Sequence, residues 1–341
     1  MNKHILVIIV IIFFYFFYIQ KKIKKDKIGI PDVKFPFINL KDQDGKNINM
    51  LGVKAYLETD ENKEKFLEYI DQGIKFIGCS SYLKYPSRCT NQHGNCHVND
   101  YKINGKYIEE YVYGWCHCFK EPEKYIKSDI PKILISESDF NAENLEYKEN
   151  IDIKYDYITV QPKDNNCKDG WHSHNKNWTL SEKCIEIFSD EFGLKGLIVG
   201  RGDCPINIKN KQNIETTESL DYFDFIDKIR ESRFMLLPNF EDPSPRVLTE
   251  ALTLNKPVFV NENILGGWKY VNDKTGMFFN ENNIRTNLIE FLQKIDTNMF
   301  SPREYYLNNH GIKHSGKELH DFLKKINPEL CDCELVRFDY A

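Results

Sequence analysis

The segment DPSPRVLTE carries the side chains most able to do chemistry. Asp242 and Glu250 are two acids eight positions apart, with Ser244 and Arg246 between them. Ser244 suits a helix N-cap and Pro245 the first helical position, so the spacing predicts that a helix starts here. Asp242 would then lie beside free backbone N–H groups, which favour anions. Arg246 and Glu250 would share one helical face, where the simplest interpretation is a surface ion pair.

Three other loops of the C-terminal half add candidates for a ligand site. Lys176 in NKNW and Arg201 in GRG are cations that could neutralise a diphosphate. Gly266 and Gly267 in ILGG form a turn that could bring backbone N–H groups close to a ligand. Three further side chains in the loop of Lys176 could line a cleft or simply pack: Trp171, His172 and His174.

The elements that must position these residues alternate between strand and helix. Short apolar runs at 155–162, 195–201, 233–238 and 257–261 predict strands, and the patterns at 180–193, 219–232 and 244–255 predict helices. This alternation predicts a parallel sheet covered by helices on both faces. Ligands bind such sheets beyond the carboxyl ends of the strands, so the four loops are expected to converge on one rim.

The N-terminal half predicts a smaller α/β domain. Residues 28–55 look irregular, 61–73 predict a helix that stops at a glycine, and 75–81 and 131–139 predict strands. A helix-like aromatic segment spans 105–115. We therefore expect four regions along the chain: a membrane anchor at 1–27, this domain at 28–150, the regular half at 151–290, and a helical tail at 291–341.

Composition sets the outer limits of function. The chain has 341 residues, 41% hydrophobic, with a net charge of −5, so nothing favours nucleic-acid binding. Ile5–Ile19 is an uncharged apolar run, and no small-residue cleavage site follows it. An uncleaved single-pass anchor is the preferred interpretation over a signal peptide. The lysines after it predict that the C-terminal part faces the cytosol, while the sequon at Asn177 leaves a luminal orientation open.

Ten cysteines occur, and five of them lie between Cys79 and Cys118. They could form disulfides, remain packed thiols, or bind zinc together with His93, His97 and His117. The long spacing from Cys89 to Cys96 fits a structural zinc site poorly, so thiols are the preferred interpretation.

Several elements in order carry a family resemblance. Asp242…Glu250-Ala-Leu is followed by Pro257-Val258, by Gly266-Gly267 and by the run TGMFF. Residues 155–285 thereby resemble the donor-binding half of GT-B glycosyltransferases, especially the retaining group 1 (family 4) enzymes. SRFMLLP…SPRVLTEAL is also similar to the exostosin-type transferases, which are inverting.

The resemblance implies roles for individual residues. Glu250 matches the acid that accepts hydrogen bonds from the nucleotide ribose, and Asp242 matches the acid that contacts the donor sugar. Asp242 is one methylene shorter than the glutamate usual in that family. Lys176 matches the lysine beside the diphosphate, and Gly266-Gly267 match the loop facing the phosphates and sugar. The usual Gly-Arg after the first strand is replaced by TVQPKD, so Arg246, Arg201 or both would supply the missing charge.

The expected protein is thus an α/β GT-B enzyme with two Rossmann-like domains facing a cleft. It would move a sugar from a nucleotide-sugar donor to a glycan, protein or lipid, with no metal and no other cofactor. A retaining enzyme needs no obvious protein nucleophile, whereas an inverting one needs a base from the N-terminal half. The candidates for that base are Glu137, Asp139, His117 and His97. The rival hypotheses are a non-catalytic sugar-nucleotide or glycan-binding module and a membrane-anchored interaction protein.

Overall fold

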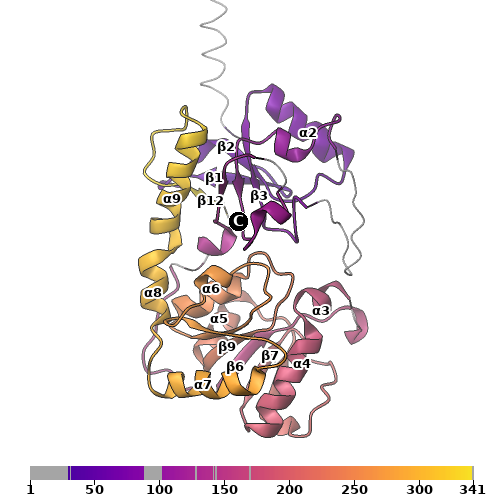
Figure 1. Cartoon of the computed structure of the whole chain (residues 1–341), viewed down its shortest axis with the longest axis vertical. Coiled ribbons are helices and arrows are strands. Elements are labelled where there is room, and N and C mark those ends of the chain that lie inside the picture. Colours follow the sequence, from indigo (N-terminus) through magenta and orange to yellow (C-terminus); the bar gives the residue numbers. More distant parts are fainter. Residues whose placement is uncertain are drawn as a thin grey trace, which may run out of the picture.

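Two sheets form two domains stacked along the long axis of the molecule (Figure 1). The computed structural model describes residues 30, 32–87, 102–126, 129–140, 142, 144–168 and 170–339. The expected anchor at 1–27 lies outside these residues. Within the described ranges, no helix is both long enough and apolar enough to cross a membrane.

The C-terminal domain contains a six-stranded parallel sheet in the order β11-β10-β9-β6-β7-β8. Its strands are β6 (Tyr155–Val160), β7 (Gly196–Val199), β8 (Ile214–Thr217), β9 (Ser232–Leu237), β10 (Val258–Asn261) and β11 (Gly276–Phe279). The chain runs outward from β6 to β8 and then returns to β9 on the other side of β6. This is the doubly wound order, and its switch point lies between β6 and β9. The predicted parallel sheet is confirmed, although β8 and β11 were not foreseen as strands.

Helices cover both faces of this sheet. They are α3 (Trp171–Asn175), α4 (Trp178–Glu186), α5 (Tyr222–Arg230), α6 (Arg246–Thr253) and α7 (Ile284–Asp296). Along β6, Tyr157 packs in the core under α4 and α7, while Ile158 packs in the core under α5 and α6. Both side chains are fully buried, as expected for strands of a two-sided parallel sheet.

The N-terminal domain contains a mixed sheet in the order β12-β1-β2-β3-β4-β5. Its strands are β1 (Phe37–Lys41), β2 (Asn47–Val53), β3 (Lys75–Cys79), β4 (Trp115–Cys116), β5 (Lys132–Ile133) and β12 (Arg337–Phe338). Strands β2 to β5 are parallel, whereas β1 runs antiparallel to both β2 and β12. This order is not doubly wound, so the expectation of two Rossmann-like domains holds only for the C-terminal one.

Three predictions for this domain were wrong in detail. Residues 28–55 are not irregular throughout, because β1 and β2 form a hairpin whose turn is the polar stretch KDQDG. Asp42 fixes that turn by accepting hydrogen bonds from the backbone N–H groups of Asp44 and Lys46. The predicted strand 131–139 shrinks to β5, and the predicted helix 105–115 shrinks to one 3-10 turn. The predicted helix 61–73 is present as α2 (Asp60–Asp71).

Short helical turns complete the described structure. They are η1 (Ile108–Glu110), η2 (Pro122–Lys124), η3 (Glu137–Asp139), η4 (Asn165–Cys167), the π-helical η5 (Ile187–Glu191), η6 (Lys211–Asn213) and η7 (Trp268–Tyr270).

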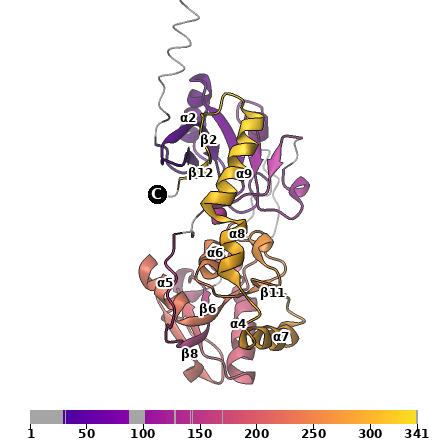
Figure 2. The same ribbon diagram turned by 90° about the vertical axis from the view of Figure 1, so that its left-hand side faces the viewer.

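The C-terminal tail returns to the N-terminal domain. After α7, helix α8 (Pro302–Asn309) passes from one domain to the other, and α9 (Gly311–Ile326) lies along the N-terminal domain (Figure 2). Strand β12 then pairs with β1. The segment 291–341 is therefore not a separate helical tail, because its last strand is an edge of the N-terminal sheet.

Candidate functional site

The loops that follow β6 and β9 meet at the switch point of the doubly wound sheet. The backbone N–H of Phe240 donates to the carbonyl of Asn175 over 3.1 Å, which aligns the two loops. This contact places Lys176 beside Asp242, with 2.5 Å between Nζ and Oδ2. Asn239 also donates to Oδ2 of Asp242, over 2.8 Å. Two of the predicted donor-binding residues, 66 positions apart, are thus brought together as a mostly buried ion pair.

Glu250 is buried in the second turn of α6. It lies near Tyr222 at the start of α5, whose pKa is raised to about 12 by burial and then by the charge of Glu250. Arg246 is exposed at the first position of α6, and its charge opposes that shift. Glu250, Tyr222 and Arg246 therefore share one electrostatic environment on the α5–α6 face of the sheet.

Ser244 does not cap α6, contrary to the prediction. The helix begins at Arg246 and Pro245 occupies the N-cap position, without a side-chain cap. The Ser244 hydroxyl instead accepts a hydrogen bond from the backbone N–H of Ser138 over 2.9 Å and contacts the Ser138 hydroxyl at 2.8 Å. The first turn of α6 is therefore attached to the N-terminal domain.

Gly266 and Gly267 pack against the Asp242–Pro245 loop. The backbone N–H of Gly266 donates to the carbonyl of Asp242 over 2.9 Å. A Cβ on Gly266 would lie 1.8 Å from the carbonyl oxygen of Pro243, and Gly267 has φ +77°. Only glycine permits so close an approach of two backbones. The N–H of Gly266 is therefore used within the protein.

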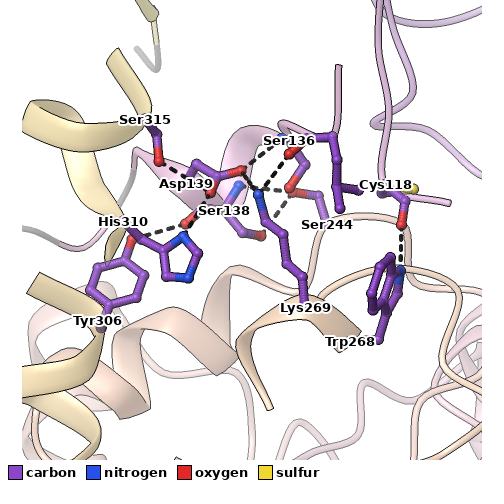
Figure 3. A network of polar contacts seen from close by, with 11 residues as sticks. Cys118, Ser136, Ser138, Asp139, Ser244, Trp268, Lys269, Tyr306, His310 and Ser315 are labelled. Carbon is purple, nitrogen blue, oxygen red and sulfur yellow. Dashed lines mark hydrogen bonds and ion pairs between the residues drawn. The ribbon is translucent and has the colours of Figure 1, made fainter. Parts of the chain in front are cut away.

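Asp139, a predicted candidate base, is fully buried and lies at the centre of an interdomain network (Figure 3). Its Oδ2 accepts hydrogen bonds from the backbone N–H of Ser136 over 2.9 Å and from Nζ of Lys269 over 2.8 Å. Its Oδ1 accepts from the Ser315 hydroxyl over 3.3 Å and lies 3.7 Å from Nδ1 of His310. We call Asp139, Lys269, His310 and Ser315 the interdomain clasp. These contacts with both domains and the returning tail favour a structural role for Asp139 over that of a base.

Other contacts extend the clasp. Burial lowers the pKa of His310 to about 4, and Asp139 opposes this only partly, so the imidazole is neutral near pH 7. Lys269 also donates to the carbonyl of Leu134 over 2.9 Å. The indole N–H of Trp268 donates to the carbonyl of Cys118 over 2.8 Å. The 3-10 turn η7 thus attaches the C-terminal domain to the loops that follow β4 and β5.

The other candidate bases are also engaged or enclosed. Glu137 forms an ion pair with Lys54 at 2.9 Å, inside the N-terminal domain. His117 is buried with its ring parallel to Phe119, and burial lowers its pKa to about 4. His97 lies outside the described residues.

Arg201 is not at the rim, contrary to the prediction. Its side chain is 1% exposed, and the guanidinium lies 3.9 Å from the centre of the Trp178 ring. Its Nη2 also donates to the Ser173 hydroxyl over 2.8 Å. The glycines on either side of Arg201 form a turn, but the guanidinium packs in the interior under α3 and α4.

A second ion pair at the rim was not foreseen. Glu241 is buried and pairs with Lys84 of the loop after β3, which bridges the two domains. His174, one of the predicted cleft residues, lies 3.6 Å from Glu241 between Nε2 and Oε2. Trp171 and His172 contact each other edge to face. The adjacent acids Glu241 and Asp242 in NFEDPSP were a sequence signal for ion pairs at the rim. Their partners are distant in sequence, so the pairing itself was not visible.

The described cysteines of the Cys79–Cys118 cluster are thiols, as expected, and a disulfide that was not predicted forms elsewhere. Cys167 and Cys204 form a disulfide that joins the loops after β6 and β7. Cys79, Cys116 and Cys118 are free, buried thiols, while Cys89 and Cys96 lie outside the described residues. In the part of the chain that the structure describes, the only group of three potential metal ligands is Cys167, Asp203 and Cys204, whose two sulfurs form this disulfide.

Known proteins resemble this chain in structure rather than in sequence. No protein-family model matches the sequence, and neither does any curated protein. TarM superposes with a TM-score of 0.52 at 12% identity, over 78% of this chain and 53% of that chain. HepE of Anabaena, solved in complex with UDP, superposes at 0.56 and 11% identity, over 78% and 77%. Sucrose-phosphate synthase from Thermosynechococcus elongatus superposes at 0.53 and 10% identity, over 82% and 74%.

The lengths compared are unequal. This chain spans about half the length of TarM and of the pneumococcal O-GlcNAc transferase GtfA. The superpositions nevertheless cover more than three quarters of this chain, which is more than either domain alone contains. Together with the doubly wound C-terminal sheet and the facing N-terminal domain, these likenesses show that the chain has the GT-B fold.

Proposed function

We propose that the protein is a glycosyltransferase that moves a sugar from a nucleotide-sugar donor to an acceptor. The observation that carries the proposal is the meeting of Lys176 and Asp242 at the switch point of the doubly wound sheet, the usual ligand position of such sheets. HepE and GtfA, which share the fold, were both solved in complex with UDP. A uridine diphosphate sugar is therefore the first donor to test.

Lys176 is the cation proposed to meet the donor diphosphate. In the free protein its ammonium is paired with Asp242, and both side chains are largely shielded from water. A diphosphate carries more negative charge than one carboxylate, so it would compete for Lys176 and leave Asp242 available to the sugar hydroxyls. Glu250 is proposed to accept hydrogen bonds from the ribose, next to Tyr222 and Arg246.

The proposed reaction retains the anomeric configuration and uses no metal. The bond from the sugar C1 to the phosphate oxygen breaks, the acceptor oxygen bonds to C1, and the acceptor proton passes to the leaving phosphate oxygen. Lys176 would stabilise the charge that develops on the diphosphate. This route needs no protein base. Three observations support this route. Glu137 pairs with Lys54, Asp139 pairs with Lys269, and His117 is buried.

Donor hydrolysis and thermal shift test the proposal. The full chain in detergent is incubated with a panel of uridine, guanosine and adenosine diphosphate sugars. Release of the nucleoside diphosphate supports the enzyme. A thermal shift without turnover favours the non-catalytic module instead, and the absence of both would reject a nucleotide-sugar site. The anomeric configuration of a transfer product, measured by NMR, decides between retention and inversion.

Glu250→Ala provides the residue-level test. We expect UDP affinity to fall at least about tenfold, because a charged hydrogen-bond acceptor contributes roughly 1.5–3 kcal/mol. Isothermal calorimetry measures the affinity, with Glu290→Ala on the exposed face of α7 as the control. Because Glu250 is buried, Glu250→Gln is measured as well to separate binding from folding. Unchanged UDP affinity in a folded Glu250 variant contradicts the assignment.

A further inference from the structure

Two pockets meet at Asn263, in the loop after β10. One has a volume of about 360 Å³ and lies between α4 and the ends of β9, β10 and β11. The other has a volume of about 240 Å³ and lies between that loop and η2 of the N-terminal domain. Asn263 lines both, so the two pockets adjoin at the domain boundary. We call the pair of pockets the Asn263 groove.

The groove combines exposed aromatic carbon with amides and hydroxyls. Phe240 lines the larger pocket with 41% of its surface exposed, beside Asn177, Thr179 and Asn261. Tyr125 lines the smaller pocket, held parallel against Phe119 with 4.1 Å between ring centres. An apolar ring surface bordered by amides suits a ligand that presents C–H faces and hydroxyls together.

The charges along the groove cancel. In the larger pocket Lys183 pairs with Glu281 at 2.8 Å, and the lining carries no other charge. In the smaller pocket Lys124 pairs with Glu121 at 2.6 Å. Its remaining charges are one cation, Lys120, and one anion, Glu262. A groove without net charge favours a neutral ligand over a phosphate or an acidic peptide.

Phe240 is held firmly and lies next to the proposed donor site. Its backbone N–H donates to Asn175, and its carbonyl accepts from the N–H of Leu265 over 2.9 Å. Glu241 and Asp242 follow it directly. Phe240 and Asp242 therefore lie two residues apart in the same loop after β9. The sequon residue Asn177 lines this pocket and caps α4 by accepting from the N–H of Leu180.

We propose that the Asn263 groove binds a neutral oligosaccharide arm of the acceptor. One sugar ring packs on Phe240 in the larger pocket, and the chain continues past Asn263 towards Tyr125. The larger volume lies within the range of about 300–1,000 Å³ typical of small-ligand pockets. This inference rests on the proposed glycosyltransferase function, and it specifies that the acceptor is a glycan longer than one sugar.

Saturation-transfer NMR tests the groove on the full chain in detergent. The probes are short neutral oligosaccharides of glucose, N-acetylglucosamine, mannose and xylose. We expect binding of at least one of them, and about fivefold weaker binding in Phe240→Ala and in Asn263→Ala. Tyr147→Ala is the matched control, since Tyr147 is 40% exposed and lies outside the groove.

UDP binding is measured on the same samples. Retained UDP binding in Phe240→Ala, together with weakened oligosaccharide binding, supports the groove. No saturation transfer across the panel, or equal binding by Phe240→Ala, overturns the groove while leaving the donor site in place if UDP still binds. If the wild-type chain does not bind UDP, the proposed function itself is rejected.

Discussion

At the scale of single residues, the glycines of ILGG have a structural role that the motif did not predict. The sequence interpretation assigned Gly266 and Gly267 to a ligand. The structure places Gly266 against the carbonyl of Pro243, so that two loops of the rim can touch. Loss of this contact would move Asp242, because its own carbonyl accepts the hydrogen bond from Gly266.

We therefore expect Gly266→Ala to destabilise the protein by about 3 kcal/mol or more, since a Cβ would overlap rigid backbone. Gly73→Ala is the control. Gly73 differs from Gly266 in having a left-handed φ, +83°, and nothing lies within 4 Å of its Cβ position, so we expect a cost of about 1 kcal/mol from backbone conformation alone. Chemical denaturation measures both variants. Equal losses in the two variants would contradict the close approach to Pro243 as the reason for the glycine at position 266.

At the scale of elements, the loop between β6 and α4 is held at two points. The pairing of Lys176 with Asp242 holds its end, and the disulfide from Cys167 to Cys204 holds its middle. Disulfides persist in oxidising compartments and are rare in the cytosol. This bond and the N-terminal lysines therefore point to different compartments, since the lysines predict a cytosolic orientation.

Peptide mapping without reducing agent should recover Cys167 linked to Cys204. Replacing both with serine should cost about 3–4 kcal/mol, the value expected for a crosslink across 37 residues. Cys184→Ser tests a buried free thiol in the same domain as the control for loss of a cysteine. The disulfide would be refuted by recovery of both thiols in reduced form from protein made in an oxidising compartment.

At the scale of the whole molecule, the interdomain clasp fixes how the domains face each other. Asp139 comes from the N-terminal domain, Lys269 from the C-terminal domain, and His310 and Ser315 from the returning tail. Three separate parts of the chain thus meet at one buried carboxylate. The clasp also neighbours Ser138 and Ser244, which attach the start of α6 to the N-terminal domain.

Lys269→Met should destabilise the protein by about 3–5 kcal/mol, because it leaves the carboxylate of Asp139 buried without its cation. The double variant with Asp139→Asn should recover part of that loss, since no uncompensated charge remains. Lys63→Met, which breaks an exposed pair with Asp60, should cost less than about 1 kcal/mol. Equal effects of Lys269→Met and Lys63→Met in thermal unfolding would contradict the clasp.

Local patterns were sufficient for β6, β7, β9 and β10 because these strands are apolar runs between helices, whereas β8, with the sequence IETT, and β11 were missed. The N-terminal domain was harder to predict, since β4 and β5 have two residues each and depend on their neighbours for pairing. The run PKILISESD has a strand-like composition, but Ser136 and Asp139 close a 3-10 turn by hydrogen bonding. Burial of Arg201 was equally invisible, since its partner Trp178 approaches only after folding.

The sequence by itself predicted the helix-covered parallel sheet of the C-terminal half and the rim on which its loops converge, because these follow from periodicity and chain direction, which are local properties. The choice of Lys176, Asp242 and Glu250 as donor-site candidates came from the resemblance of their motifs to those of GT-B glycosyltransferases. Only the tertiary structure decided that Asp139 is part of the interdomain clasp, that Ser244 joins the two domains, and that Cys167 pairs with Cys204. Each of these depends on a partner distant in the chain, and which distant residues meet is set by packing of the whole molecule.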